Sequence, residues 1–253
     1  MSEWALAGVI LAFVFAGMPL GLALQRVLPE SHLAQDSKDV VKLGAGVIAT
    51  LTALVLGMLV STAKGSLDAK NADIMQVAVK ILVVDSDLAR YGPEAGAARE
   101  LLRGGLAQLL ATAAAEGPRA AAARGERAPT RLIEQFQQAV RGLAPRDDEQ
   151  RALKAEIVSL ARDVGAIRWT LVERDTNSIP TPFLVLVVLW LVAIYTLFGM
   201  IAPHNGTVWA VMFVSALSFV GTILVIIDTD RASGGLITVS TAPLVDALGR
   251  LGR

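Results

Sequence analysis

The feature that most constrains this chain is a set of four apolar segments, each about 20 residues long. A helix rises about 1.5 Å per residue, so about 20 apolar residues cross a hydrocarbon core of about 30 Å. A helix also satisfies its own backbone hydrogen bonds, which lipid requires. We therefore predict an all-α integral membrane protein with transmembrane helices at 4–28, 40–63, 183–202 and 208–227.

Composition supports this class of protein and excludes several others. Hydrophobic residues make up 54% of the chain, and the mean hydropathy is +0.56, both high for a soluble domain. The 23 basic and 23 acidic residues cancel, which does not indicate nucleic acid as a partner. The absence of cysteine excludes disulfides, thiolate metal sites and a thiol nucleophile.

The charged residues are concentrated in the middle of the chain and divide it into four parts. Short loops, "LPESHLAQDSKD" and "PHNG", join the spans into two hairpins. We predict a first transmembrane hairpin (1–64), a cytoplasmic helical domain inserted between spans two and three (65–178), a second hairpin (179–230) and a cytoplasmic tail (231–253). The first span is interpreted as a retained anchor, because Glu3 stands where a signal peptide carries positive charge.

Lysine and arginine near the span ends set the predicted orientation. More of them flank the central segment than the two short loops, and cytoplasmic loops carry this excess. The prediction is a multi-pass protein of a bacterial inner membrane, with both termini and the central domain in the cytoplasm.

The central segment is predicted to be helical, because its apolar residues recur at intervals of three and four. A helix should begin at Pro93, and further helices should cover 130–142 and 147–175. The alanine- and arginine-rich stretch 117–130 has no apolar stripe, so we expect a loop or a poorly ordered segment there. In span one, Gly17, Pro19 and Gly21 predict a kink.

Span two carries a stripe of small residues at helical spacing. Such a stripe permits close approach of another helix, which favours a packing face. The same side could instead line a narrow pore, where apolar rings gate by dewetting, with Thr50, Leu54 and Met58 as candidates. The stripe consists of Gly46, Ala49, Thr50, Ala53, Gly57 and Ser61.

Two lysines bracket the same span. Lys42 and Lys64 are 22 residues apart, about 33 Å at about 1.5 Å per residue, which matches the bilayer core. Around an axis they would form two cationic rings that favour anions. Alternatively they are interfacial lysines, partly neutralised by Asp39 and Asp68.

A few polar residues elsewhere are candidates for smaller roles. Arg168 and Trp169 precede Pro180 and Pro182 at the junction with span three, where they either couple the cytoplasmic helix to that span or anchor it at the headgroups. His32 and His204 lie in the two short loops and are weak candidates for a metal pair, with solvated loop residues as the alternative.

Motifs of common enzyme classes, including phosphate-binding loops, H-E-x-x-H and G-x-S-x-G, are missing from the sequence. We therefore expect neither an enzyme nor a cofactor.

Several blocks, in order, resemble the bacterial bestrophin-like family, a domain of unknown function. They include "LPESHLAQDSKDVVKLGAGVIATLTALVLGMLV", "RWTLVERDTNSIPTPFLVLVVLWL", "FGMIAPHNG" and "DRASGGLITVSTAPLVDALGRLG". The resemblance implies four spans with cytoplasmic helices extending from spans two and three. True bestrophins are similar in plan, and they are pentamers that conduct anions through a pore lined by the second span.

By that analogy the protein would be a homo-oligomeric anion channel in the lipid bilayer, a pentamer as true bestrophins are. Thr50, Leu54 and Met58 would form its gate. The alternative function is a non-conducting membrane scaffold that recruits partners through its cytoplasmic helices. A wet axis with lysines at its mouths favours the channel, and lipid-tight contact between second spans favours the scaffold.

Overall fold

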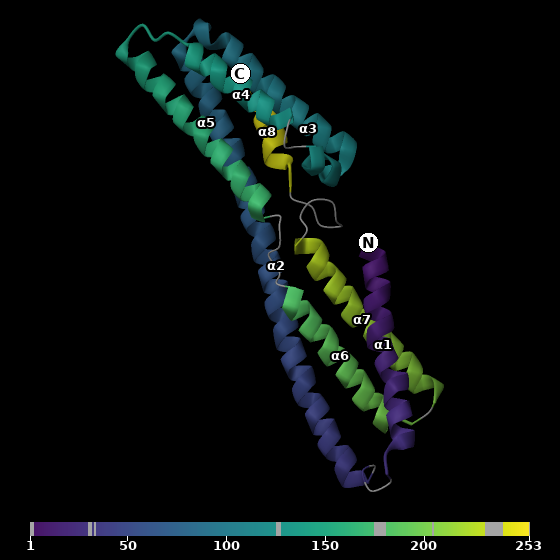
Figure 1. Ribbon diagram of the computed structural model, residues 1–253. Helices are drawn as coiled ribbons and strands as arrows, with labels where there is room; N and C mark the ends of the chain where they lie inside the picture. The colour runs from purple at the N-terminus through teal and green to yellow at the C-terminus, as the bar shows by residue number, and fades with distance from the viewer. Residues whose placement is uncertain are drawn as a thin grey trace. The chain divides into compact units, whose positions relative to one another are not determined.

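The structure is a computed structural model that describes residues 3–29, 32, 34–124, 128–174, 181–203, 205–230 and 240–252 (Figure 1). In these residues the regular secondary structure is helical, which confirms the all-α fold class. The elements are α1 (Glu3–Val27), α2 (Gln35–Tyr91), the 3₁₀ turn η2 (Pro93–Ala95), α3 (Gly96–Arg124), α4 (Ala128–Gly142), α5 (Asp148–Arg174), α6 (Thr181–Ile201), α7 (Gly206–Asp230) and α8 (Ala242–Arg250).

Four of these helices are long and apolar enough to cross a membrane. They are Ala5–Val27, part of Gln35–Tyr91, Thr181–Ile201 and Gly206–Thr229. Each corresponds to one of the four predicted spans, to within one residue at the ends of the first and third, and the spans are thereby confirmed by length and composition. The chain divides into two compact units, Met1–Lys64 with Ser178–Asp230 and Gly65–Asn177 with Arg231–Arg253.

The first unit contains α1, the first half of α2, α6 and α7, and we call it the membrane unit. Its core joins all four helices through apolar side chains that include Val14 of α1, Leu59 of α2, Leu191 of α6 and Ile223 of α7. Edge-to-face ring contacts of Phe15 add to the α1–α7 contact.

Glycines allow the backbones of α1 and α6 to come into direct contact. A Cβ on Gly17 would lie 2.6 Å from the carbonyl oxygen of Val192, and a Cβ on Gly21 would overlap that of Thr196. Gly199 of α6 faces the backbone of Met18 in the same way. The sequence G-M-P-L-G is thus a small-xxx-small contact motif. Pro19 lies inside α1, which extends on both sides of it; the kink expected at these residues stays a prediction.

The second unit contains the rest of α2 with η2, α3, α4, α5 and α8, and we call it the helical unit. One cluster packs α2 against α3, α4 and α5 around Leu88, Phe136 and Ile157. A second cluster packs α8 onto α2 and α3 through Leu244 and Leu251. Gly92, with a φ of 116°, makes the turn after α2 that lets Pro93 start the next element.

The predicted loop at 117–130 is wrong for most of its length. Helix α3 continues to Arg124, and α4 begins at Ala128. Alanine and arginine have high intrinsic helix propensity, so the backbone remains helical without an apolar stripe. The helices predicted at 130–142 and 147–175 correspond to α4 and α5.

Candidate functional site

The candidate pore residues of span two lie on one exposed face of α2. Thr50, Leu54 and Met58 follow one another at intervals of four, which places them along one side of a helix with 3.6 residues per turn. The Leu54 and Met58 side chains are 71% and 49% exposed, and Thr50 is exposed as well. None of the three belongs to the core of the membrane unit.

The opposite side of the same helical segment is buried. Leu56, Leu59 and Ala63 pack in the core of the membrane unit, and Thr52 is 1% exposed while its hydroxyl donates to the carbonyl oxygen of Ile48 at 2.7 Å. One face of span two therefore packs in the core of the membrane unit, whereas the opposite face is exposed.

The stripe of small residues lies on the uncovered face. All six of its members are exposed. A Cβ on Gly46 or Gly57 would meet nothing within 4 Å, and the Thr50 hydroxyl donates to the carbonyl oxygen of Gly46 in its own helix, at 2.9 Å. Packing against another helix of the same chain is thus not the role of this stripe.

The two bracketing lysines differ in their environment. The Lys42 ammonium donates to Asp39 Oδ1 at 2.8 Å in an exposed ion pair, as the sequence predicted. Lys64 is exposed, and in the part of the chain that the structure describes no ion pair joins it to Asp68. Lys64 is therefore the less neutralised of the two charges.

The remaining candidates are not brought together into a site. Trp169 is 74% exposed near the end of α5, and Arg168 belongs to the same helix, but its side chain lies outside the described part. His32 is exposed, and its backbone N–H donates to the carbonyl oxygen of Pro29 at 3.0 Å. His204 lies outside the described residues, as does the junction at 175–180.

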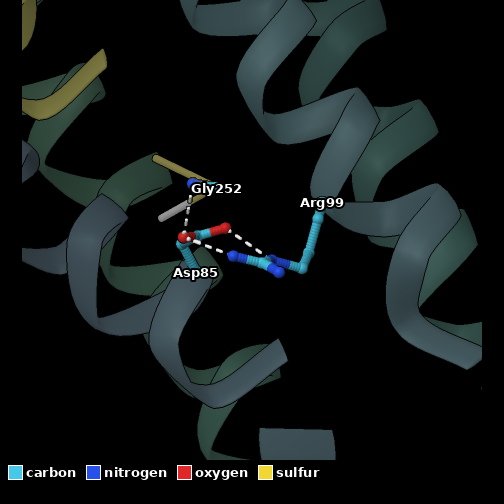
Figure 2. A network of polar contacts seen from close by, with 3 residues as sticks. All are labelled: Asp85, Arg99 and Gly252. Atoms are coloured by element: carbon cyan, nitrogen blue, oxygen red, sulfur yellow. Dashed lines mark hydrogen bonds and ion pairs between the residues drawn. The ribbon is translucent and has the colours of Figure 1, made fainter. Parts of the chain in front are cut away.

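The sequence reading missed a polar network in the helical unit (Figure 2). Arg99 of α3 donates two hydrogen bonds to the carboxylate of Asp85 in α2, at 2.8 and 2.9 Å. The backbone N–H of Gly252 donates a third, at 3.1 Å. Asp85 is 8% exposed, and it stands 22 residues beyond the end of span two.

These hydrogen bonds favour the charged form of the carboxylate. Arg99 holds the pKa of Asp85 below its ordinary value, with Gly252 acting in the same direction against the effect of burial. The network ties the C-terminal residues to α2 and α3. An aspartate inside the apolar run "ILVVDSDLA" was the signal available in the sequence, but its partners are 14 and 167 residues away.

Asp87, two residues further along α2, is buried in a less favourable environment. It is 6% exposed, and Oδ2 has no hydrogen-bond partner among the described residues. Burial raises the pKa of Asp87, and the nearby Glu156 adds to the effect while Arg90 opposes it. Tyr91, one turn later, also has a buried hydroxyl that makes no hydrogen bond within the part of the chain that the structure describes.

Among the described residues, no group of three histidine, cysteine, aspartate or glutamate side chains is arranged to hold a metal ion. The geometry that remains is an apolar and small-residue helix face in a membrane unit. Together with four membrane-length helices, it defines a multi-span helical membrane protein.

The family model for the bestrophin-like domain matches residues 11–244, so the chain belongs to the bestrophin-like family. This confirms the resemblance noted in the sequence blocks. No curated protein and no solved structure matches the chain. Membership in this family suggests a membrane-embedded, oligomeric channel.

Proposed function

We propose that this protein is a homo-oligomeric, anion-conducting channel in which α2 lines the pore. Thr50, Leu54 and Met58 form its apolar gate. The observation that carries the proposal is the face of α2 that its own chain leaves uncovered, with Leu54 71% exposed at its centre. Following the family resemblance, the proposed assembly is a pentamer.

Contact with lipid alone accounts less well for this face. The exposed sides of α6 and α7 carry bulky side chains such as Leu189, Val214 and Leu217, which suit contact with acyl chains. The exposed side of α2 alternates such residues with Gly46, Ala49, Ala53 and Gly57. Small residues in membrane helices allow close helix approach, so this side suits other copies of α2 around an axis.

The part of α2 in the helical unit also has an exposed apolar side. Met75, Val79 and Val83 are 52%, 52% and 39% exposed. They follow one another at intervals of four, so helical periodicity places them on one side of this part of α2. Outside lipid an apolar stripe is normally covered by another helix, which supports assembly along α2.

The charge at the pore mouths supports selectivity for anions. Lys64 makes no ion pair with Asp68, whereas Lys42 is paired with Asp39. A ring of Lys64 side chains would therefore raise the local concentration of inorganic anions more effectively than a ring of Lys42. We place Lys64, both termini and residues 65–178 on the cytoplasmic side of a bacterial inner membrane. The proposed role is transport without enzymatic activity.

The test is ion flux from liposomes that contain the purified protein, with chloride and potassium gradients compared. Leu54→Ala should raise chloride flux, because it shortens an apolar gate residue. Lys64→Glu should reduce the preference for chloride. The matched control is Leu189→Ala, the same truncation at a 60% exposed leucine of α6, which should leave flux unchanged.

Absence of chloride flux from verified oligomers in the wild type and in Leu54→Ala would refute the channel. The scaffold that recruits partners through its helical unit would then be the function to test. Flux with the same ion preference in Lys64→Glu as in the wild type would refute the role of Lys64 alone.

A further inference from the structure

Carboxylates recur at intervals of seven residues along α5. They belong to Glu149, Glu156 and Asp163. Seven residues are close to two helical turns, so the three side chains lie on one side of the helix. Lys80 and Asp87 of α2 have the same spacing, and this part of α2 belongs with α5 to the helical unit. The two rows can therefore face each other with the same period.

Two ion pairs show that the rows do face each other, with the helices antiparallel. Lys80 Nζ lies 2.7 Å from Asp163 Oδ2, and Arg90 Nη2 lies 3.4 Å from Glu149 Oε1. Residue numbers therefore increase along α2 as they decrease along α5. Between the two pairs, apolar side chains of both helices pack in one cluster.

This register brings Asp87 to the position opposite Glu156. Asp87 is seven residues after Lys80, and Glu156 is seven residues before Asp163. An ion pair stands on either side of this position, whereas the position itself joins two carboxylates. The pKa of Asp87 reflects this environment, because burial raises it and the charge of Glu156 raises it further.

Among the described residues, Asp87 has no ion-pair partner. Arg90 of its own helix acts on Asp87, but the Arg90 guanidinium is paired with Glu149. Other charged groups of the surrounding helices and turns are held by partners of their own. Lys154 donates to the carbonyl oxygens of Arg141 and Leu143, Arg99 is bonded to Asp85, and Arg146 is paired with Glu94.

The environment of Asp87 suits a protonated carboxyl group better than a carboxylate. Asp87 is 6% exposed, and Oδ2 has no hydrogen-bond partner among the described residues. A buried ion without a partner is costly, whereas a protonated carboxyl group carries an O–H donor. Glu156 is exposed, so its carboxylate stays ionised and supplies an acceptor at the adjacent position.

We propose that Asp87 and Glu156 share one proton and form a pH-sensitive contact between α2 and α5. With the proton bound, the Asp87 O–H donates to the Glu156 carboxylate and joins the helices. As the pH rises, the proton passes to water, the two carboxylates repel each other and the contact weakens. The weakening begins above the ordinary carboxyl pKa, because the pKa of Asp87 is raised in the folded state. The proposal applies equally to a channel or a scaffold.

The test is hydrogen exchange of α5 in the full-length protein, measured by mass spectrometry and corrected for the intrinsic rate at each pH. Exchange of a helix reports how often it opens from its contacts. At pH 7, α5 should exchange about two- to fivefold faster in the wild type than in Asp87→Asn, the range of a partly exposed charge pair. In acid, below the ordinary carboxyl pKa, the two rates should be equal.

Two glutamates of α5 provide a matched pair of variants. Glu156→Gln removes a like charge beside Asp87 and should slow the exchange of α5 at pH 7. In the Asp87→Asn background most of this effect should disappear, because the like-charge pair is already gone. Glu149→Gln makes the same change on the same side of α5 but removes the partner of Arg90, so it should not slow exchange.

Equal effects of Glu156→Gln and Glu149→Gln at pH 7 would overturn the proposal, as would an effect of Glu156→Gln that is undiminished in Asp87→Asn. Protection of α5 that depends on added calcium rather than on pH would also overturn it, since the two carboxylates would then hold a cation. If Asp87→Asn does not fold, the comparison of Glu156→Gln with Glu149→Gln decides, because both glutamates are exposed. These outcomes are independent of the flux assay.

Discussion

Replacing Gly21 with alanine is expected to destabilise the contact between α1 and α6. The added Cβ would overlap the carbonyl oxygen of Thr196 and lie 2.7 Å from the backbone nitrogen of Met200. Both are backbone atoms of a helix, so neither can rotate away, and the two helices must separate. Overpacking of this kind costs about 1–3 kcal/mol.

Part of this cost is offset within α1 itself. Alanine is a better helix former than glycine by about 1 kcal/mol, so the free energy of unfolding should fall by up to about 2 kcal/mol. For a chain of this size each kcal/mol shifts Tm by about 2–4 °C. The expected decrease in Tm for Gly21→Ala is therefore up to about 8 °C.

The assay is thermal unfolding of the purified protein in detergent, followed by circular dichroism and by the fraction that remains monodisperse on size exclusion. Gly8→Ala is the control, because it makes the same change on the same helix with nothing within 4 Å of the new Cβ. It should retain or slightly raise Tm. Equal Tm values for Gly21→Ala and Gly8→Ala would refute the glycine-mediated contact.

Three further predictions concern polar groups. Asp85→Ala should lower the free energy of unfolding by about 2–3 kcal/mol at pH 7, because Arg99 loses a partly buried partner. Asp163→Ala is the control: it removes the more exposed ion pair with Lys80 and should lower the free energy of unfolding by less than about 1 kcal/mol. Since the pKa of Asp85 is lowered in the folded state, its contribution is complete above the ordinary carboxyl pKa, and a denaturant titration at falling pH should show the Asp85→Ala difference shrinking. The pKa of Asp87 is raised in the folded state, so its ionised form opposes folding above the ordinary carboxyl pKa. The Asp87→Asn variant should therefore be more stable than the wild type at pH 7 but not in acid. Lower stability of this variant at pH 7 would contradict the reasoning. Tyr195→Phe removes a hydrogen bond of 3.0 Å from the Tyr195 hydroxyl to the carbonyl oxygen of Met212 in α7. It should lower the free energy of unfolding by about 0.5–1.5 kcal/mol in the same assay. An unchanged free energy of unfolding would mean that this bond is not formed in the membrane.

Local features of the sequence were sufficient for the spans and for most helices. The apolar runs fixed the four membrane-length helices, and periodicity with Pro93 located the start of the next element after α2. The same reasoning failed at 117–130, where the missing apolar stripe suggested a loop. Amphipathicity reports which side of a helix is buried, and a helix rich in alanine can form without it.

The candidate pore face was predicted only in part. Helical spacing put Thr50, Leu54 and Met58 on one side of span two, but the sequence left a helix-packing face and a pore lining as alternatives. The structure buries Leu56 and Leu59 instead. Which side of an apolar helix is covered depends on partners distant in sequence, here α6 and α7.

The sequence by itself determined that this protein crosses a membrane as helices. The length and polarity of a segment are local properties, and they decide whether the segment can span the hydrocarbon core with its backbone hydrogen bonds satisfied. The tertiary structure alone decided what the glycines and the buried charges do. Gly21 contacts α6 and Asp85 contacts Arg99 and Gly252. These contacts join residues far apart in the chain, and steric fit and hydrogen-bond geometry select them only when the helices have come together.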